Sequence, residues 1–401
     1  MPQRDPVIIV GAGPAGLAVA VILARAGVPS LVFEAEAKLP RDLRAGSFHP
    51  PTLELLDSIG IAQDFLALGI RVPRWQIRGR EEGVIVEWDL SLLADLTPYP
   101  FRFHCEQFKL TPLLQARLEA LGGSVRFAHR FVAATQDEGG VTARFETPDG
   151  IETVRGSYLI GADGARSVVR HQMDVAFEGF TWPERFLVIG IGQDLAPHGY
   201  TDNAYIADPV DWGAIFKMPH NGPPGLWRVL FPTDTALPDE EVLSHNFAQQ
   251  VLQNFLPRSQ PYDIEHTNIY RVHQRVAAEF RQGRFLIVGD AAHVNNPLGA
   301  FGLNGALHAA FNLGETLALV WRGEADESLL DRYVRQRRTA NIAFVQAQSI
   351  RNKQVLEEKD PAIRARNLVE LRAIRADPAR HKEYLIRSSM IASLRHAASI
   401  A

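Results

Sequence analysis

Three glycines at a fixed spacing near the start of this chain are of the kind that binds a dinucleotide. The segment 11–16 reads Gly-Ala-Gly-Pro-Ala-Gly and follows the apolar run 7–10. In such a turn Gly11 permits a sharp bend, Gly13 lets the backbone approach a pyrophosphate, and Gly16 allows a helix to pack closely on the sheet. The amino terminus of that helix supplies amides and a dipole that favour phosphate. The spacing therefore predicts a strand, a tight turn and a helix.

Two further segments strengthen this interpretation. A second strand, predicted over 30–33, ends at Glu34, whose carboxylate can accept hydrogen bonds from adenosine ribose hydroxyls and would repel a 2′-phosphate. Residues 289–293 read Gly-Asp-Ala-Ala-His after the apolar run 285–288. A lone glycine fingerprint is often incidental, but here strand, helix and acid stand where the fingerprint needs them. Together the segments 11–16 and 289–293 indicate binding sites for opposite ends of one dinucleotide, and their combination points to FAD.

The composition is that of a globular protein with large cores. The 401 residues are 46% hydrophobic and 22% charged, with a formal net charge of −4. Basic residues are interleaved with acidic ones, so we expect no nucleic-acid partner. The one cysteine, Cys105, excludes an intramolecular disulfide, and we expect it to be a small buried apolar residue. Nothing resembles a signal peptide or an uninterrupted membrane span, so we expect a cytoplasmic protein with no membrane partner. We expect no metal site.

The elements that position these residues indicate two packed domains. Helices are predicted over about 52–59, 108–121 and 303–321, and strands rich in aromatics and prolines over 176–275. The predicted fold class is α/β, with a Rossmann-like FAD-binding domain discontinuous in sequence, an inserted β-sheet substrate domain and a helical C-terminal segment. We expect the FAD-binding domain in 1–70, 106–175 and 276–325, the substrate domain in 71–105 and 176–275, and the C-terminal helices in 326–401.

Four motifs occur in a characteristic order. They are the fingerprint with Glu34, then Arg44-Ala45-Gly46, then Gly-Ala-Asp-Gly-Ala-Arg-Ser at 161–167, and finally Gly289-Asp290 followed by Pro-Leu-Gly-Ala-Phe-Gly-Leu-Asn at 297–304. With these motifs the chain resembles single-component FAD-dependent aromatic hydroxylases of the 4-hydroxybenzoate 3-monooxygenase type. The resemblance covers nearly the full length and thins after about residue 325.

The resemblance implies a set of contacts with FAD. Arg44 and Gln107 would contact the diphosphate and ribityl region, and Asp290 the ribityl chain. Residues 297–304 would lie beside the isoalloxazine, where amides near a helix amino terminus stabilise negative charge on its pyrimidine oxygens. Asp163 and Arg166 would be contacts with FAD or with the nicotinamide cofactor. In the alternative interpretation Asp163 caps a helix and Arg166 is a surface charge. The predicted cofactor-binding residues are Gly11, Gly13, Ala15, Gly16, Glu34, Arg44, Gln107, Asp163, Asp290, Pro297, Gly299, Gly302, Leu303 and Asn304.

The resemblance also implies a reaction. NADH or NADPH, binding transiently because no second fingerprint is present, would reduce FAD, and O2 would form a C4a-hydroperoxyflavin that transfers oxygen to a small aromatic or heteroaromatic phenol. The protein would exclude water, orient the ring and withdraw the phenol proton. Candidates for this base, or for substrate contacts, share only a place on loops or strands that could border the cavity. They are His49, Tyr205, His220 and Tyr270.

The sequence also departs from this family. The stretch 212–220 lacks the serine and arginine that bind the carboxylate in the 4-hydroxybenzoate enzyme, and His308 stands about where many relatives have an aspartate. An epoxidase, or an oxygenase that modifies an antibiotic or polyketide, shares every motif and stays an alternative. A flavin-dependent halogenase is expected to contain a Trp-x-Trp-x-Ile-Pro segment, and this sequence has none. A non-catalytic GDI-like binding protein is the alternative of another class. The C-terminal helices could cover the substrate domain or pair two subunits, so we expect a monomer or homodimer.

Overall fold

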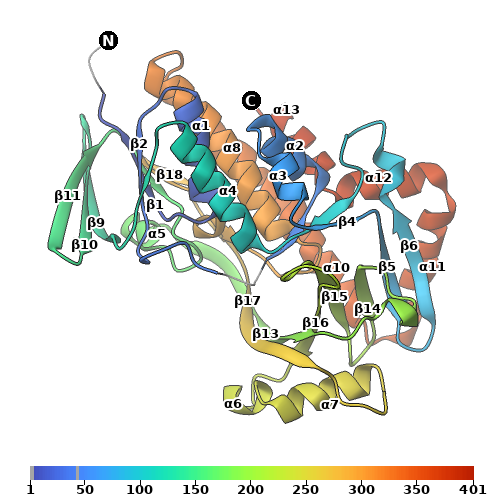
Figure 1. Ribbon diagram of the computed structural model, residues 1–401. Helices are drawn as coiled ribbons and strands as arrows, with labels where there is room; N and C mark the ends of the chain where they lie inside the picture. Colours follow the sequence, from blue (N-terminus) through green and yellow to red (C-terminus); the bar gives the residue numbers. More distant parts are fainter. Residues whose placement is uncertain (1–3, 42–44) are drawn as a thin grey trace.

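The chain forms two sheet-containing bodies flanked by its C-terminal helices. The computed structural model describes residues 4–41 and 45–401. Figure 1 shows a parallel sheet with its helices in the upper body, an antiparallel sheet with α6 (Asp239–Val242) and α7 (His245–Phe255) below, and the C-terminal helices along one side. One cleft lies between the two sheets.

The upper body is built on a six-stranded sheet in the order β18-β19-β12-β1-β2-β8. Its centre is the parallel set β19 (Phe285–Ile287), β12 (Leu159–Gly161), β1 (Val7–Val10) and β2 (Ser30–Phe33). The edges are β18 (Arg281–Gln282) and β8 (Val125–Arg126). The central strands are short and apolar, as expected for parallel strands that are buried on both faces. Segments from three distant parts of the sequence therefore meet in one sheet.

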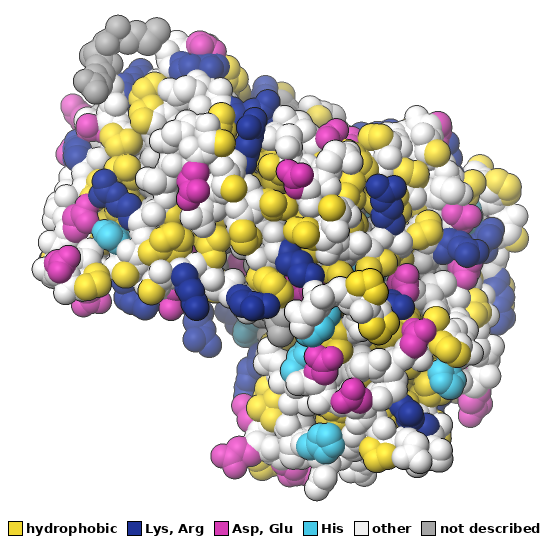
Figure 2. Space-filling view, in the orientation of Figure 1, with side chains coloured by type: hydrophobic (Ala, Val, Ile, Leu, Met, Phe, Trp, Pro, Cys, Tyr) yellow, Lys and Arg dark blue, Asp and Glu magenta, His cyan; other side chains and the backbone are white. Residues whose placement is uncertain are grey.

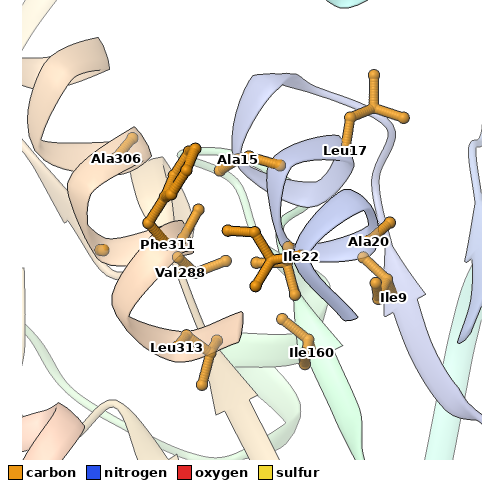
Figure 3. Packing of buried hydrophobic residues seen from close by; sticks show 14 of the residues in the cluster. Ile9, Ala15, Leu17, Ala20, Ile22, Ile160, Val288, Ala306, Phe311 and Leu313 are labelled. Atoms are coloured by element: carbon orange, nitrogen blue, oxygen red, sulfur yellow. The ribbon is translucent and has the colours of Figure 1, made fainter. Parts of the chain in front are cut away.

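Three helices pack together beside this sheet. The first, α1 (Pro14–Arg25), lies against α8 (Phe301–Arg322), and α4 (Gln107–Ala120) lies beside α1. Figure 3 shows Ala15 and Ile22 of α1 facing Phe311 and Leu313 of α8. Close approach depends on small residues, because a Cβ at Gly314 would stand 2.8 Å from Cγ2 of Ile22. The loop that precedes α8 is thus held at a fixed distance from the turn that precedes α1.

The lower body is built on an eight-stranded sheet in the order β20-β17-β13-β16-β15-β14-β5-β6. Its strands are β20 (His293–Val294), β17 (Ile264–Ala277), β13 (Phe177–Ile191), β16 (Leu226–Thr233), β15 (Gly213–Met218), β14 (Asn203–Ala207), β5 (Arg74–Gly79) and β6 (Gly83–Asp89). One face packs under α7 with an apolar core that includes Ile189, Ile215 and Trp227. The alternate residues of these strands face the upper body and the C-terminal helices.

Two three-stranded sheets complete the β structure. One is the meander β9 (Arg130–Asp137), β10 (Gly140–Thr147) and β11 (Gly150–Gly156), and the other joins β3 (Ser47–Phe48), β7 (Arg102–His104) and β4 (Ile70–Val72). The short helices α2 (Pro50–Ser58), α3 (Ala62–Leu66) and α5 (Val168–Gln172) connect these parts. Strand β3 reaches the cleft at Ser47, and β7 pairs with β3.

The C-terminal segment is helical, as the sequence predicted. It comprises α9 (Ser328–Ala340), a π-helical turn over Asn341–Gln346, α10 (Ala347–Glu357), α11 (Pro361–Ala376), α12 (Pro378–Ser388) and α13 (Ile391–Ser399). Asp360 and Asp377 cap α11 and α12 through side-chain bonds to two amides each, and a proline follows each cap. Helices α10, α11 and α12 pack on the eight-stranded sheet side, near β14 and β6.

The surface carries charges of both signs. Figure 2 shows acidic and basic side chains interspersed on this face, with no continuous basic area. In the described part of the chain, no helix has the length and apolar character needed to cross a membrane, and no group of His, Cys, Asp and Glu side chains is arranged to hold a metal ion. Cys105 is fully buried, and burial raises the pKa of its thiol to about 12.

Candidate active site

One cleft joins the glycine turn to the eight-stranded sheet. It has a volume of about 640 Å³. At one end it is lined by the turn after β1 and the end of β2, and at the other by β13, β15, β16 and β17. Most of the predicted cofactor-binding residues line it, namely Gly11, Gly13, Ala15, Glu34, Gln107, Asp163, Asp290, Pro297, Gly302 and Leu303. The segments that the sequence singled out are therefore brought together.

The three glycines of the fingerprint have different surroundings. Gly11 has φ +103°, and a Cβ there would stand against the carbonyl of Ala162. A Cβ on Gly16 would run into the carbonyl oxygen of Gly11, so Gly16 permits the turn and lies behind the cleft wall. A Cβ on Gly13 would meet nothing within 4 Å and would project into open space. Gly13 is thus the position where a ligand phosphate can approach the backbone.

Glu34 is held at the end of β2 by backbone amides. Its Oε2 accepts a hydrogen bond from the amide of Ala12 at 2.8 Å, and its Oε1 accepts one from Glu36 at 3.0 Å. A carboxylate oxygen has a further lone pair, so each can still accept from a ribose hydroxyl. The fixed carboxylate lies one strand away from the glycine turn, as the fingerprint requires.

Asp163 holds the start of α5 at the edge of the cleft. Its carboxylate accepts from the Ser167 hydroxyl at 2.6 Å and from the amides of Val168 and Val169 at 2.7 and 3.2 Å. Burial raises its pKa, against the effect of these hydrogen bonds. Asp163 thus satisfies the first amides of α5, whose N-cap residue is Ser167. Arg166 lines the same cleft.

The segment expected beside the isoalloxazine, residues 297–304, is here called the flavin loop. Gly299 has φ +110° and Ala300 has φ +60°, so the chain turns sharply before α8 begins at Phe301. Pro297, Ala300, Phe301, Gly302 and Leu303 line the cleft. The first amides of α8 therefore lie at the cleft, where a helix amino terminus stabilises negative charge.

Asn304 does not line the cleft but holds the flavin loop from behind. Its Oδ1 accepts from the His49 amide at 2.8 Å and the Thr52 hydroxyl at 2.6 Å, and its Nδ2 donates to the carbonyls of Ser47 and Ala300. The Thr52 hydrogen is used in this way, so the 2.9 Å contact between Thr52 Oγ1 and His308 Nε2 must have His308 as donor. His308, which the sequence analysis noted as a departure, orients Asn304 through Thr52.

The other predicted cofactor-binding residues lie outside the cleft lining. Gly299 faces a second cavity, and Gly16 lies behind the turn. Arg44 lies outside the described residues.

The four predicted base candidates are not brought together. His49 is fully buried behind the flavin loop, where its Nε2 donates to the carbonyl oxygen of Gly299 at 2.8 Å, and burial lowers its pKa to about 3. His220 lies on a turn and pairs with Glu265 at 3.1 Å. Tyr205 accepts from the Gly299 amide at 3.2 Å and faces the second cavity. Of the four, Tyr270 lines the cleft, and burial raises its pKa.

The sequence analysis missed three polar residues at the sheet end of the cleft. They are Arg228 on β16, and His266 and Asn268 on β17. Arg228 is 5% exposed and pairs across the strands with Phe216, and its charge opposes the rise in the pKa of Tyr270. Burial lowers the pKa of His266. An available signal was the charged residue inside the apolar run Trp-Arg-Val-Leu-Phe at 227–231.

The residues present fit FAD. The open space at Gly13 admits a phosphate, and Glu34 offers acceptors to a ribose. Near the flavin loop, Oδ1 of Asn295 is buried in the cleft wall without a hydrogen-bond partner among the described residues. A buried acceptor of this kind is satisfied when a ligand donor such as a ring N–H reaches it. Mixed polar and apolar walls around a cleft of about 640 Å³ suit a dinucleotide carrying a flat ring system.

Comparison with known proteins identifies similar chains. Residues 4–348 match the FAD binding domain family. The para-nitrophenol 4-monooxygenase of Pseudomonas sp. (strain WBC-3) is 35% identical over 390 residues, which cover 96% of each chain. The 6-hydroxy-3-succinoylpyridine 3-monooxygenase HspB of Pseudomonas putida (strain DSM 28022 / S16) is 34% identical over 365 residues, 90% of this chain and 91% of that one.

A solved structure is similar over nearly the whole chain. The crystal structure of p-nitrophenol 4-monooxygenase PnpA from Pseudomonas putida DLL-E4 matches with a TM-score of 0.92 and 32% identity. The match covers 98% of this chain and 99% of that chain, so the C-terminal helices are included.

Proposed function

The chain belongs to the FAD binding domain family of flavin-dependent aromatic hydroxylases, and on that premise we propose that it hydroxylates a small phenol-type ring at the sheet end of its cleft. The predicted family, α/β fold, FAD cofactor and monooxygenase class are thereby confirmed. The reductant, NADH or NADPH, and the use of O2 are part of the proposal. So is the substrate, for which a 4-nitrophenol or a hydroxypyridine is the first choice, because the relatives act on such rings.

The observation that carries the proposal is the buried charge of Arg228 at the sheet end of the cleft. Around it in the cleft lining stand Val188, Leu230, Phe216 and Met218. In a site with few waters, a fixed guanidinium favours the ionised form of a nearby phenol. The phenolate is the better nucleophile toward an electrophilic oxygen, so this one charge both orients the ring and activates it.

The other polar groups have supporting roles in this proposal. His266 is kept largely neutral by burial and can accept the phenol proton, and Asn268 and Tyr270 can hydrogen-bond a ring substituent. When bound, FAD supplies electron transfer from the nicotinamide and activation of oxygen. The amides at the start of α8 stabilise negative charge there.

The test is steady-state turnover by the purified holoenzyme. NADH and NADPH oxidation would be followed with 4-nitrophenol, 6-hydroxynicotinate and 4-hydroxybenzoate, and the aromatic products quantified against reductant consumed. We expect one of the first two rings to give coupled product formation, and 4-hydroxybenzoate to give little. If no phenol or hydroxypyridine is converted while either nucleotide reduces the flavin, the proposed substrate class is wrong.

A further inference from the structure

A second cavity lies between the eight-stranded sheet and the C-terminal helices. Its volume is about 440 Å³. Its sheet side comes from β5, β7 and β14, and its cover from α10, α11 and α12. At one end it reaches the flavin loop at Gly299 and Phe301, and of the described residues Phe301 alone lines both this cavity and the main cleft. The cavity is therefore a separate compartment next to the cofactor site.

A buried cation with no carboxylate partner among the described residues forms part of its wall. Arg102 is 1% exposed. Its Nη1 donates to the neutral groups Asn203 Oδ1 at 2.7 Å and Tyr205 Oη at 3.4 Å, while its Nε has no partner among the described residues. An arginine stays ionised in a protein, and burying it without a counter-ion is unfavourable. An anion in the cavity would offset that cost.

The mouth of the cavity adds two more guanidinium groups. Arg351 of α10 and Arg387 of α12 line it, and both are exposed. The one carboxylate among the described lining residues, Glu370, is paired with Arg380, whose Nη2 lies 2.6 Å from its Oε1. The net charge of the lining is positive, and the two exposed arginines can draw an anion toward Arg102.

The remaining wall suits a flat ring. Trp75, Tyr205, Tyr384 and Phe301 are all lining residues. The guanidinium of Arg102 stacks 4.3 Å from the ring centroid of Trp75, and the Trp75 indole N–H is buried without a partner among the described residues. The unpaired groups named in this wall are donors, so an acceptor-rich ligand fits it better than a donor-rich one. The volume is that of a small-molecule site.

We propose that this second cavity binds an aromatic carboxylate, with its ring among Trp75, Tyr384 and Phe301 and its carboxylate toward Arg102 and the two mouth arginines. Bound there, the ligand touches two groups that fix the flavin loop. One is Phe301 itself, and the other is Tyr205, which accepts the amide hydrogen of Gly299 at 3.2 Å. An aromatic acid bound there would thus affect the cofactor site through the flavin loop, without entering the main cleft.

The experiment measures binding, so it does not depend on turnover or on the proposed substrate. Benzoate, which has no ring hydroxyl to hydroxylate, is titrated into the holoenzyme by isothermal calorimetry, with neutral benzamide as a second probe. Because Arg102 is buried and its loss could unfold the protein, the test variant is Arg351→Gln with Arg387→Gln at the mouth. The matched control is Arg372→Gln, which changes an exposed arginine of α11 outside the cavity lining. Arg228→Gln probes the main cleft.

The expected result is stoichiometric benzoate binding that benzamide does not reproduce. The mouth double variant should weaken it roughly tenfold, equivalent to about 1.4 kcal/mol, because two charge-assisted contacts are lost. Arg372→Gln and Arg228→Gln should leave the affinity unchanged. Absence of benzoate binding at millimolar concentrations overturns the proposal, and so does binding that Arg228→Gln abolishes while the mouth variant retains it, since the acid then occupies the main cleft.

Discussion

The imidazole of His49 and the carbonyl of Gly299 are joined by a 2.8 Å hydrogen bond behind the flavin loop. Since the carbonyl can only accept, Nε2 of His49 carries the hydrogen, and the ring is neutral because burial lowers its pKa to about 3. His49 also donates its amide to Asn304, so one residue fixes both ends of the loop's turn. A residue that the sequence offered as a catalytic base is therefore better placed to hold the cofactor site in shape.

Replacing His49 tests this positioning role. His49→Leu leaves the Gly299 carbonyl without a partner, a loss of about 1–3 kcal/mol for a buried acceptor, and we expect weaker FAD affinity and a shifted flavin reduction potential. His49→Gln can place an amide nitrogen where Nε2 stood and should restore most of both. The measurements are cofactor fluorescence titration and potentiometry. A potential that is the same in the wild type and the leucine variant would contradict the role.

The fingerprint glycines give a prediction that separates folding from cofactor binding. Gly13→Ala adds a methyl group that meets nothing within 4 Å in the protein but enters the space proposed for the pyrophosphate. We expect nearly wild-type stability of the apoprotein and FAD affinity lowered at least tenfold. Gly16→Ala drives a Cβ into the Gly11 carbonyl and should lower both stability and affinity. Chemical unfolding of the two apoproteins distinguishes the cases; equal destabilisation by both changes would argue against the open site at Gly13.

Buried histidines set the acid stability of the fold. Burial lowers the pKa of His49, His104 and His293 from 6.5 to about 3, so between these values the unfolded chain binds protons that the folded chain does not. Stability is therefore complete above pH 6.5 and falls as the pH drops toward 3, by about 1.4 kcal/mol per pH unit for each histidine. Urea unfolding of the holoenzyme between pH 7 and pH 5 measures the slope. His293→Gln should flatten it by one proton, and a slope unchanged by this substitution would count against the assignment.

Arg228 should be visible in the ionisation of a bound phenol. 4-Nitrophenol changes its absorbance when it ionises, so its pKa on the enzyme can be read directly from a pH titration. We expect a value below that of the free phenol in the wild type, and a rise of about one unit or more in Arg228→Gln, equivalent to at least about 1.4 kcal/mol of lost interaction. Arg228→Lys keeps the charge and should retain part of the effect. Identical titrations in the wild type and Arg228→Gln would place the phenol elsewhere.

Local sequence patterns predicted much of this molecule. The strand, turn and helix at the fingerprint, the helix that became α8 and the helical C-terminal segment follow from glycine spacing, apolar runs and prolines at helix starts. These features depend on neighbouring residues along the chain. The predicted domain boundaries, the FAD contacts of individual residues and the monomer or homodimer stay predictions.

What the sequence could not predict depends on strand register and on packing between distant segments. The stretch 212–220 contains no arginine, whereas Arg228 reaches the cleft from the next strand, opposite Phe216. Nothing in the sequence indicates that Tyr205 turns toward the C-terminal helices while Tyr270 faces the cleft. The partner of His308 is Thr52, 256 residues away, which only the packing of α2 on α8 reveals.

A single turnover with labelled oxygen tests whether the protein hydroxylates a phenol-type ring. The holoenzyme, reduced by NADH or NADPH without air and holding 4-nitrophenol, is mixed with ¹⁸O2, and the aromatic product is analysed by mass spectrometry in the wild type and in Arg228→Gln. We expect one ¹⁸O atom in the wild-type product and a much smaller labelled yield in the variant. Reoxidation that gives only labelled hydrogen peroxide, with 4-nitrophenol and a hydroxypyridine alike, would contradict the proposed hydroxylation.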